Sequence, residues 1–281
     1  MLALLFPGQG SQEVGMGRDV YAVSEAARCV FDAADAVLDL PLSRLCFEGP
    51  EDELLRTEIQ QPAILTTGIA LLRALEERME LAPAYTAGHS LGEYTALVAS
   101  GSLAFEDAVR TVQARGRFMQ EAVPAGRGAM AAVLGASPED VSRVCELARA
   151  ETGRVVAPAN YNAPRQTVIS GDAVAVEVAC SRARQEGARR TIPLAVSAPF
   201  HCSLMRPAAE KLALELERVR FGDPHPPVMS NVEAAPVERG ARFADLLVQQ
   251  VTSPVRFTEM IAGMEQRGVT GFLEVGPGRV L

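Results

Sequence analysis

Lysine and histidine are scarce in this sequence, and their scarcity excludes several kinds of chemistry. Of the 27 basic residues only Lys211 is a lysine, which leaves almost no candidate for a Schiff base or a phosphate-loop lysine. The three histidines and the five scattered cysteines, with no C-x-x-C pair, lack the spacing of metal ligands. We therefore expect no metal site.

Long apolar runs and basic tracts are also missing. No apolar stretch approaches the length of a membrane span, and Met1 leads into a short strand without the basic start of a signal peptide. The net charge of −8 and the lack of a Lys/Arg run argue against nucleic-acid binding. These features predict a cytoplasmic, globular protein that contacts neither membrane nor nucleic acid.

What the sequence does contain is a serine between two glycines, in Gly88-His89-Ser90-Leu91-Gly92-Glu93. Flanking glycines permit a sharp strand-to-helix turn in which a Cβ would clash, and such a turn exposes the serine hydroxyl as a nucleophile. The helix that follows would direct its N-terminal amides at the site. Ser-x-x-Glu is also a capping box, so Ser90 could instead simply cap that helix, with Glu93 as its partner.

A glycine-rich loop, Pro7-Gly8-Gln9-Gly10-Ser11-Gln12, follows the apolar run 3–6. Its spacing lacks the third glycine of a dinucleotide-binding turn. A loop at the carboxyl end of a buried strand is still where open α/β sheets bind ligands. Gln9 is therefore either a ligand contact or a simple turn residue.

Arg115 stands out in the predicted helix 106–121. Helical spacing places it on the same face as the apolar residues Ala108, Val109, Val112 and Met119. A buried guanidinium needs an anion, yet no acid lies three or four residues away. The missing partner is either a ligand carboxylate or a distant carboxylate of the fold, unless the head group reaches solvent.

His201 is the best candidate for a general base, by elimination. His225 lies in a proline-rich surface segment, and His89 adjoins Ser90 on a turn where neighbouring side chains diverge. His201 lies in a loop before the predicted helix 207–219 and could remove the Ser90 proton. Cys202 is a weaker nucleophile candidate, because adjacent side chains seldom face each other.

The predicted order of helices and strands changes after residue 124. Between 130 and 194 the predicted order is strand, helix, strand, strand, helix, strand, which is typical of a ferredoxin-like unit. We therefore predict a small domain at 125–196, inserted into a large α/β domain formed by 1–124 and 197–281. A cleft between the two domains is the natural place for a ligand.

Five motifs occur together and in order. They are Pro7-Gly8-Gln9-Gly10-Ser11-Gln12, Gly88-His89-Ser90-Leu91-Gly92-Glu93-Tyr94, Arg115, Phe200-His201 and Glu274-Val275-Gly276-Pro277-Gly278. With them the chain resembles the malonyl-CoA:acyl carrier protein transacylases, an acyltransferase family shared with polyketide synthases. The resemblance covers nearly the whole length, and it implies an α/β-hydrolase-like large domain with a mostly parallel sheet and a ferredoxin-like small domain.

The resemblance also implies roles for single residues. Ser90 matches the serine that is acylated, and His201 matches its base. The backbone N–H groups of Gln9 and Leu91 match the oxyanion donors of the family. Gln250, before a Ser-Pro-Val turn, resembles the residue whose acceptor orients the histidine.

The implied activity is ping-pong transfer of a malonyl group from malonyl-CoA to the pantetheine thiol of acyl carrier protein, for fatty-acid or polyketide synthesis. Arg115 would hold the malonyl carboxylate, no cofactor would be needed, and we expect a monomer. Carrier proteins are acidic, as this chain is, so docking requires a local basic patch. We expect it at Arg189 and Arg190, with Arg165 and Arg206 nearby.

Two other functions are compatible with some of these features. A serine thioesterase or esterase would share the turn around Ser90 but needs an acid between the serine and the histidine, at a strand end. The candidate acids Asp107, Asp140 and Asp172 all begin predicted helices instead. A non-catalytic module that binds carrier proteins would need neither Ser90 nor His201.

Overall fold

Two β-sheets organise the chain, which the computed structural model describes over residues 1–196 and 198–281. The larger sheet contains, in spatial order, β8 (Pro236–Val237), β7 (Val228–Met229), β2 (Pro83–Gly88), β1 (Leu2–Phe6) and β9 (Gly271–Glu274). β1 pairs in parallel with β2 and β9, β2 pairs in parallel with β7, and β8 runs antiparallel to β7. The mostly parallel sheet predicted from the sequence is confirmed.

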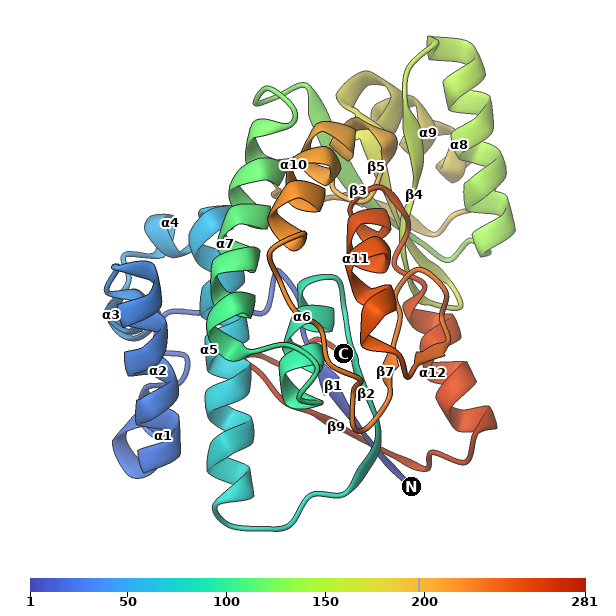
Figure 1. The fold of residues 1–281 in the computed structure, drawn as a ribbon. Coiled ribbons are helices and arrows are strands. Elements are labelled where there is room, and N and C mark those ends of the chain that lie inside the picture. Colours follow the sequence, from blue (N-terminus) through green and yellow to red (C-terminus); the bar gives the residue numbers. More distant parts are fainter. Residues whose placement is uncertain (197) are drawn as a thin grey trace.

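Helices cover both faces of this sheet because both faces are apolar. Along β1, Leu4 and Phe6 join one core while Ala3 and Leu5 join another, the alternation of a strand buried on both sides. α12 (Phe257–Gln266) packs on the Ala3 side. The helices of the other side run next to one another in Figure 1: α5 (Thr57–Glu76), α6 (Leu91–Ala99), α7 (Phe105–Glu121), α10 (Arg206–Leu216) and α11 (Phe243–Thr252), with α1 (Arg18–Val23), α2 (Glu25–Leu38), α3 (Leu42–Glu48) and α4 (Glu51–Leu54) beyond α5.

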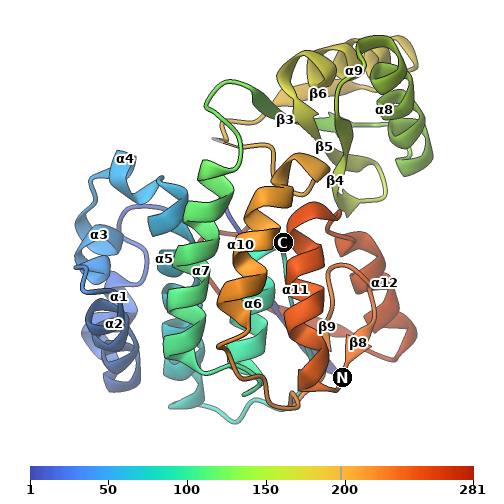
Figure 2. The same ribbon diagram turned by 45° about the horizontal axis from the view of Figure 1, so that its top comes forward.

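A second, antiparallel sheet has the spatial order β4-β5-β3-β6 and lies at one end of the molecule (Figure 2). Its elements follow the predicted order: β3 (Gly128–Leu134), α8 (Pro138–Thr152), β4 (Val156–Ala163), β5 (Gln166–Asp172), α9 (Ala173–Gln185) and β6 (Arg190–Pro193). The two helices pack on the face that carries Ala131 and Val133, whereas Met130 and Ala132 face the main core. The domain boundaries at 125 and 196 stay a prediction, and Ser197 lies outside the described residues.

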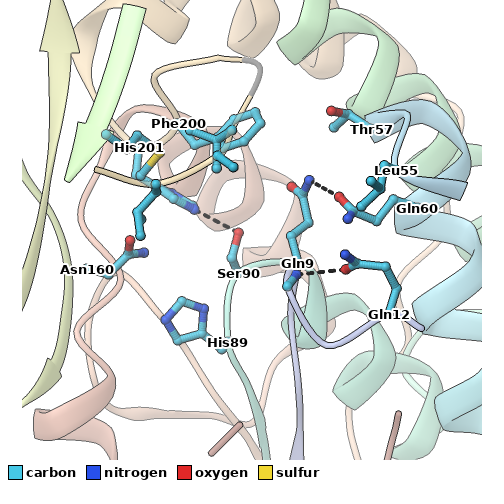
Figure 3. A pocket seen from close by; sticks show the side chains of 15 residues that line it. Gln9, Gln12, Leu55, Thr57, Gln60, His89, Ser90, Asn160, Phe200 and His201 are labelled. Atoms are coloured by element: carbon cyan, nitrogen blue, oxygen red, sulfur yellow. Dashed lines mark hydrogen bonds between the residues drawn. The ribbon is translucent and has the colours of Figure 1, made fainter. Parts of the chain in front are cut away.

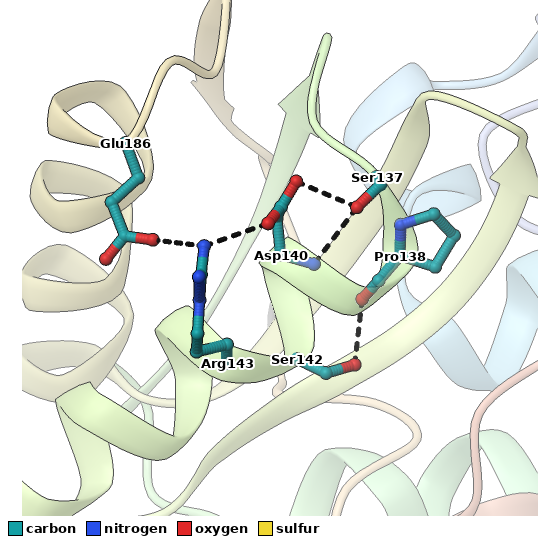
Figure 4. Close-up of polar contacts among 6 residues, drawn as sticks. All are labelled: Ser137, Pro138, Asp140, Ser142, Arg143 and Glu186. Carbon is teal, nitrogen blue, oxygen red and sulfur yellow. Dashed lines mark hydrogen bonds and ion pairs between the residues drawn. The ribbon is translucent and has the colours of Figure 1, made fainter.

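The start of α8 shows why one candidate acid cannot assist the histidine. The Ser137 hydroxyl accepts from the Asp140 amide at 3.1 Å, and Asp140 in turn pairs with Arg143 at 2.8 Å (Figure 4). Arg143 also reaches Glu186 at the end of α9. Asp140 therefore serves the helix N-terminus, as the sequence indicated.

Three predicted elements differ from the structure. The apolar residues of 20–38 recur at helical spacing and predict one helix, but that helix is interrupted at Ser24, whose hydroxyl accepts from the Ala27 amide and so starts α2. The segment 227–232 predicts a strand, but β7 ends at Met229. The segment 160–164 has the composition of a loop between two strands, but most of it belongs to β4, which continues to Ala163 with an irregular register. α3 and α12 were not predicted. Within residues 1–196 and 198–281, no helix has the length and apolarity needed to cross a membrane.

Candidate active site

The serine turn has the sharp form that its flanking glycines predict. Ser90 lies between the end of β2 and the start of α6, with φ 53° and ψ −103°, an unusual backbone for a non-glycine residue. A Cβ on Gly88 would lie 2.0 Å from the Gly92 carbonyl, and one on Gly92 would lie 2.0 Å from the Phe6 oxygen. Leu91 begins α6, so its amide belongs to the first turn, where amides lack partners along the helix.

Ser90 does not act as a helix cap. Within the described residues its side chain makes no capping hydrogen bond, and its Oγ instead lies 2.7 Å from Nε2 of His201. The Glu93 carboxylate accepts from the backbone amide of Asn231 and from the side chain of Gln250. The capping-box alternative is therefore wrong for this turn.

His201 approaches Ser90 from the loop before α10, and Figure 3 shows imidazole and hydroxyl pointing at each other. Its Nδ1 lies 2.8 Å from the backbone carbonyl oxygen of Gln250. A carbonyl can only accept, so Nδ1 carries the proton and Nε2 accepts from the serine hydroxyl. His201 also has a positive φ, 61°. Both members of the pair are thus held in a sparsely populated backbone conformation.

The surroundings of His201 favour its neutral form. Burial and the nearby charge of Arg115 lower its pKa to about 3, against the opposing effect of the Gln250 carbonyl. The imidazole is therefore unprotonated near neutral pH, as a base must be before it accepts a proton. Its orienting partner is a neutral carbonyl, at the place where serine hydrolases put a carboxylate.

Arg115 is 1% exposed and lies on the buried face of α7, as its spacing predicts. Its Nη1 donates to Oε1 of Gln61 at 2.8 Å. Its Nη2 donates to Oε1 of Gln250 at 2.8 Å and to Oγ of Ser90 at 3.1 Å. The guanidinium also lies 5.5 Å from the centre of the Tyr94 ring. The fold thus holds a cation beside the nucleophile with neutral acceptors.

The sequence left open whether Arg115 binds a ligand carboxylate, pairs with a distant carboxylate of the fold or reaches solvent, and the structure bears on the last two. The head group does not reach solvent, and within the described part of the chain it forms no ion pair. Its Nε has no hydrogen-bond partner there. A buried cation with neutral contacts attracts an anion strongly, because little water screens it. The geometry therefore suits a negatively charged group next to Ser90.

The loop after β1 packs directly against the serine turn. A Cβ on Gly8 would lie 2.4 Å from the carbonyl oxygen of His89. The side chain of Gln9 is tied to α5, since its Nε2 donates to Gln60 at 2.5 Å and its Oε1 accepts from Gln61 at 3.3 Å. These bonds fix the loop beside the serine turn.

A cavity of about 430 Å³ opens onto the Ser90 hydroxyl. Gln9 and Gln60 line it from the large-sheet side, and Asn160 lines it from the small sheet (Figure 3). Met130, on β3 of the small sheet, lines it as well. A pocket between two structural units is where a ligand is expected. The Ser90 hydroxyl therefore faces a space that can hold a ligand.

Sequence reasoning missed Asn231, which braces the serine turn. Its Oδ1 accepts from the Ser90 amide at 2.7 Å, and its Nδ2 donates to the Gly88 carbonyl at 2.7 Å. One fully buried side chain therefore joins both ends of the turn. Asn231 follows β7 at the carboxyl end of the sheet, and that position was a usable signal. The overlong strand prediction concealed it.

His89 and Cys202, the other candidate side chains near Ser90 and His201 in the sequence, have other partners. His89 contacts Asn162 at 2.8 Å and packs against Phe257, so it supports the turn. The Cys202 thiol faces the Pro199 carbonyl, and burial raises its pKa, which disfavours the thiolate. Cys202 is thus not arranged as a nucleophile.

Arg189 and Arg190 are exposed at the start of β6. With Arg165 they line a surface groove of about 620 Å³, and none of the described residues that line it is acidic. Arg206, at the start of α10, is not among them. Four residues beyond Arg190, Leu194 lines the active-site cavity, and at ~3.3 Å per residue the two positions are ~13 Å apart.

Comparison with known proteins finds similarity along the whole chain. Residues 3–281 match the acyl transferase domain family. The malonyl CoA-acyl carrier protein transacylase of Bacillus subtilis is 51% identical over 280 residues, which cover 100% of this chain and 88% of the relative. The Escherichia coli K12 protein of the same name is 47% identical over 279 residues, 99% of this chain and 90% of the relative.

Solved structures are similar as well. An acyl carrier protein S-malonyltransferase from Vibrio cholerae matches with a TM-score of 0.96 and 42% identity over 99% of this chain and 90% of that one. A malonyl-transacylase in complex with its type II polyketide acyl carrier protein matches with a TM-score of 0.96 and 44% identity, over 99% of this chain and 90% of that one. The α/β-hydrolase-like fold expected from the sequence is confirmed.

Proposed function

The chain belongs to the acyl transferase domain family, and we propose that it transfers a malonyl group from malonyl-CoA to an acyl carrier protein through a malonyl ester of Ser90. One observation carries this proposal. The Ser90 hydroxyl lies 2.7 Å from an imidazole nitrogen and 3.1 Å from a buried guanidinium. A nucleophile, its base and a cation for the acyl carboxylate thus converge on one oxygen.

In the first half-reaction, Nε2 of His201 takes the proton of Ser90 as Oγ attacks the malonyl thioester. The tetrahedral oxyanion accepts hydrogen bonds from the amides of Gln9 and Leu91, at the helix N-terminus and the adjoining loop. When the intermediate collapses, the imidazole returns the proton to the departing CoA thiol. The product is the malonyl-enzyme.

The second half-reaction reverses these steps with a different thiol. The pantetheine thiol of the carrier gives its proton to His201 and attacks the ester, and Ser90 leaves and regains a proton. The neutral carbonyl of Gln250 holds the imidazole in the tautomer that both halves require. CoA leaves before the carrier binds, and Ser90 holds the malonyl group in between, which makes the reaction ping-pong.

Arg115 selects donors that carry a carboxylate on the acyl group. Its Nη2 already contacts the oxygen that becomes acylated, so the malonyl carboxylate lies within its reach. A planar guanidinium binds a carboxylate through two parallel N–H donors. Donors with an uncharged acyl group, such as acetyl-CoA, cannot make this bond.

Substrates and partner follow from the same reaction. Malonyl-CoA is the donor, acyl carrier protein is the partner, and the malonyl-carrier product supplies extender units for fatty-acid or polyketide synthesis. Arg189 and Arg190 form the docking surface for the acidic carrier, supported by the basic groove that they line. The chain acts as a monomer, and the chemistry needs no cofactor because serine and histidine supply its nucleophile and its base.

The test follows the malonyl group. After incubation with malonyl-CoA, the intact mass of the protein should increase by one malonyl group, and peptide mapping should place it on Ser90. Added holo-carrier should then receive the group. If free malonate accumulated while the carrier stayed unmodified, the protein would be a thioesterase and the proposal would be wrong.

A further inference from the structure

Glu93 and Arg115 are the two most deeply buried charged side chains. Each is 1% exposed, and among the described residues no other Asp, Glu, Lys or Arg is buried to this degree. They are linked by a single amide. Nε2 of Gln250 donates to Oε2 of Glu93 at 2.8 Å, and Oε1 of Gln250 accepts from Nη2 of Arg115 at 2.8 Å. Opposite charges that are separated by one amide group in a poorly hydrated interior stabilise each other.

We infer that Glu93 is the counter-charge of Arg115 in the free enzyme and takes up a proton when Ser90 carries an acyl group that has its own carboxylate. This inference rests on the proposed function, which places that carboxylate at Arg115. In the malonyl-enzyme two carboxylates share one guanidinium, and a buried site disfavours the surplus negative charge. A proton removes it. Glu93 is therefore a positioning residue, which acts through Gln250 and Arg115.

The hydrogen bonds decide which carboxylate receives the proton. Among the described residues, Glu93 accepts only from neutral amides: Gln250 at 2.8 Å, and the backbone of Asn231 at a longer 3.3 Å. The acyl carboxylate would contact the guanidinium itself, and such charge-assisted bonds are stronger. Because the hydrogen bonds to ionised Glu93 are the weaker ones, Glu93 is the more basic of the two carboxylates.

Electrostatics act in the same direction. Burial raises the pKa of Glu93 to about 7, while its hydrogen bonds and the charge of Arg115 hold this value down. When the acyl carboxylate neutralises Arg115, that restraint weakens and the pKa of Glu93 rises further. At a pH slightly above 7, such as 7.5, the group then changes from mostly ionised to mostly protonated.

The other titratable groups near Glu93 are accounted for. Tyr94, its neighbour on α6, stays neutral because burial raises its pKa. His201 and His89 are titratable, and burial lowers the pKa of each. Besides α7, which carries Arg115, the elements that pack on α6 are α5, β1, β2 and β7, and their described buried residues include no charged side chain. The group that could compete with Glu93 for the proton is therefore His201, because the charge of Arg115 also affects its pKa.

The experiment counts protons in a single half-reaction. Formation of the acyl-enzyme moves the Ser90 proton to the CoA thiol, so the exchange itself neither consumes nor releases a proton below the pKa of the thiol. Excess enzyme is mixed with malonyl-CoA in weak buffer containing a pH indicator, and intact mass confirms the adduct. With a Glu93 pKa of about 7, we expect uptake of more than about half a proton per adduct near pH 7.5, falling to none below about pH 5.

Two comparisons keep the result specific. Glu93→Gln should lose the uptake, whereas Glu177→Gln, the same change at an exposed site on α9, should keep it. In the wild-type protein, acetyl-CoA should give an adduct without uptake, which tests the inference even if Glu93→Gln does not fold. A malonyl adduct without proton uptake, or equal uptake in Glu93→Gln, would overturn the role of Glu93. Absence of any malonyl adduct on Ser90 would instead contradict the proposed function.

Discussion

The Ser90 hydroxyl lies 2.7 Å from Nε2 of His201, although 111 positions separate the two residues in the chain. Both have a positive φ, which ordinary side chains adopt only where the surrounding structure holds them. Asn231 bridges the serine turn, and the Gln250 carbonyl fixes the imidazole. The reactive pair is therefore positioned before any substrate binds, so variants of the pair test chemistry directly.

Replacing Ser90 by alanine should abolish covalent malonylation. The variant keeps the cavity and the imidazole but has no oxygen to acylate, so transfer should fall by about 10⁴-fold or more. Intact-mass spectra after incubation with malonyl-CoA give the first readout, and the rate of carrier malonylation gives the second. Ser181→Ala, on α9, is the control and should behave as the wild-type protein. A malonyl adduct on Ser90→Ala would disprove the assignment.

Replacing Arg115 by alanine should remove the preference for malonyl donors. Loss of a buried charge that pairs with the acyl carboxylate costs about 2–5 kcal/mol, or roughly 30- to 4,000-fold in kcat/KM for malonyl-CoA. Transfer from acetyl-CoA should fall much less, because acetyl has no carboxylate. Arg115→Lys keeps the charge but loses the planar fork, so it should recover only part of the preference. An equal loss with both donors would refute the role.

Several parts of the site could be predicted because local sequence determines them. The glycines around Ser90 are required because a Cβ at either position would lie 2.0 Å from backbone atoms, and glycine is a residue type that can be read directly from the sequence. Arg115 was placed correctly because helical spacing sets which side of α7 it occupies. Its partners could not be predicted, since Gln61 and Gln250 come from other elements.

Other features depend on pairing that sequence does not encode locally. Pro158, Asn160 and Asn162 give the second half of β4 the composition of a turn, yet β5 pairs with it through two register shifts. The bracing by Asn231 required the true end of β7, and strand ends are poorly determined by composition. Tertiary contacts outweighed local propensity at both places.

Adding a methyl group at Gly92 should destabilise the fold. Its Cβ would lie 2.0 Å from the Phe6 carbonyl oxygen and 3.0 Å from that of Pro7, and neither backbone atom can move freely. We expect Gly92→Ala to lower the free energy of unfolding by about 3 kcal/mol or more in urea titrations. Gly222→Ala is the control, since its Cβ would have no neighbour closer than 3.8 Å. Equal stability of the two variants would contradict the close approach.

His201 should make the protein less stable in acid. Burial and Arg115 lower its folded pKa from the usual 6.5 to about 3, so between these values only the unfolded state takes up the proton. The stability it contributes is complete above pH 6.5 and is lost as the pH falls toward 3, by on the order of 3–5 kcal/mol. Urea unfolding at pH 7 and pH 4 should therefore show a larger loss for wild type than for His201→Gln. Glu93 changes the stability in the opposite direction between pH 4.5 and 7, because its folded pKa is raised. This contribution is present in both the wild-type protein and His201→Gln, so it does not affect their comparison. Parallel losses would argue against a neutral, buried His201.

Reversing the charge of Arg189 and Arg190 should weaken carrier binding without affecting the donor. None of the described residues that line their groove is acidic. β6 leads from this groove to Leu194, which lines the active-site cavity, so an acidic carrier bound at the groove could extend its arm to Ser90. Arg189→Glu with Arg190→Glu should raise KM for the carrier by about tenfold, with a smaller effect at high salt, since opposite charges speed encounter. KM for malonyl-CoA should stay the same, because the donor enters without the carrier. Arg218→Glu with Arg220→Glu, after α10, changes the net charge equally and should leave both constants near wild type. If the control pair raised the carrier KM as much as the docking pair, overall charge rather than this groove would recognise the carrier.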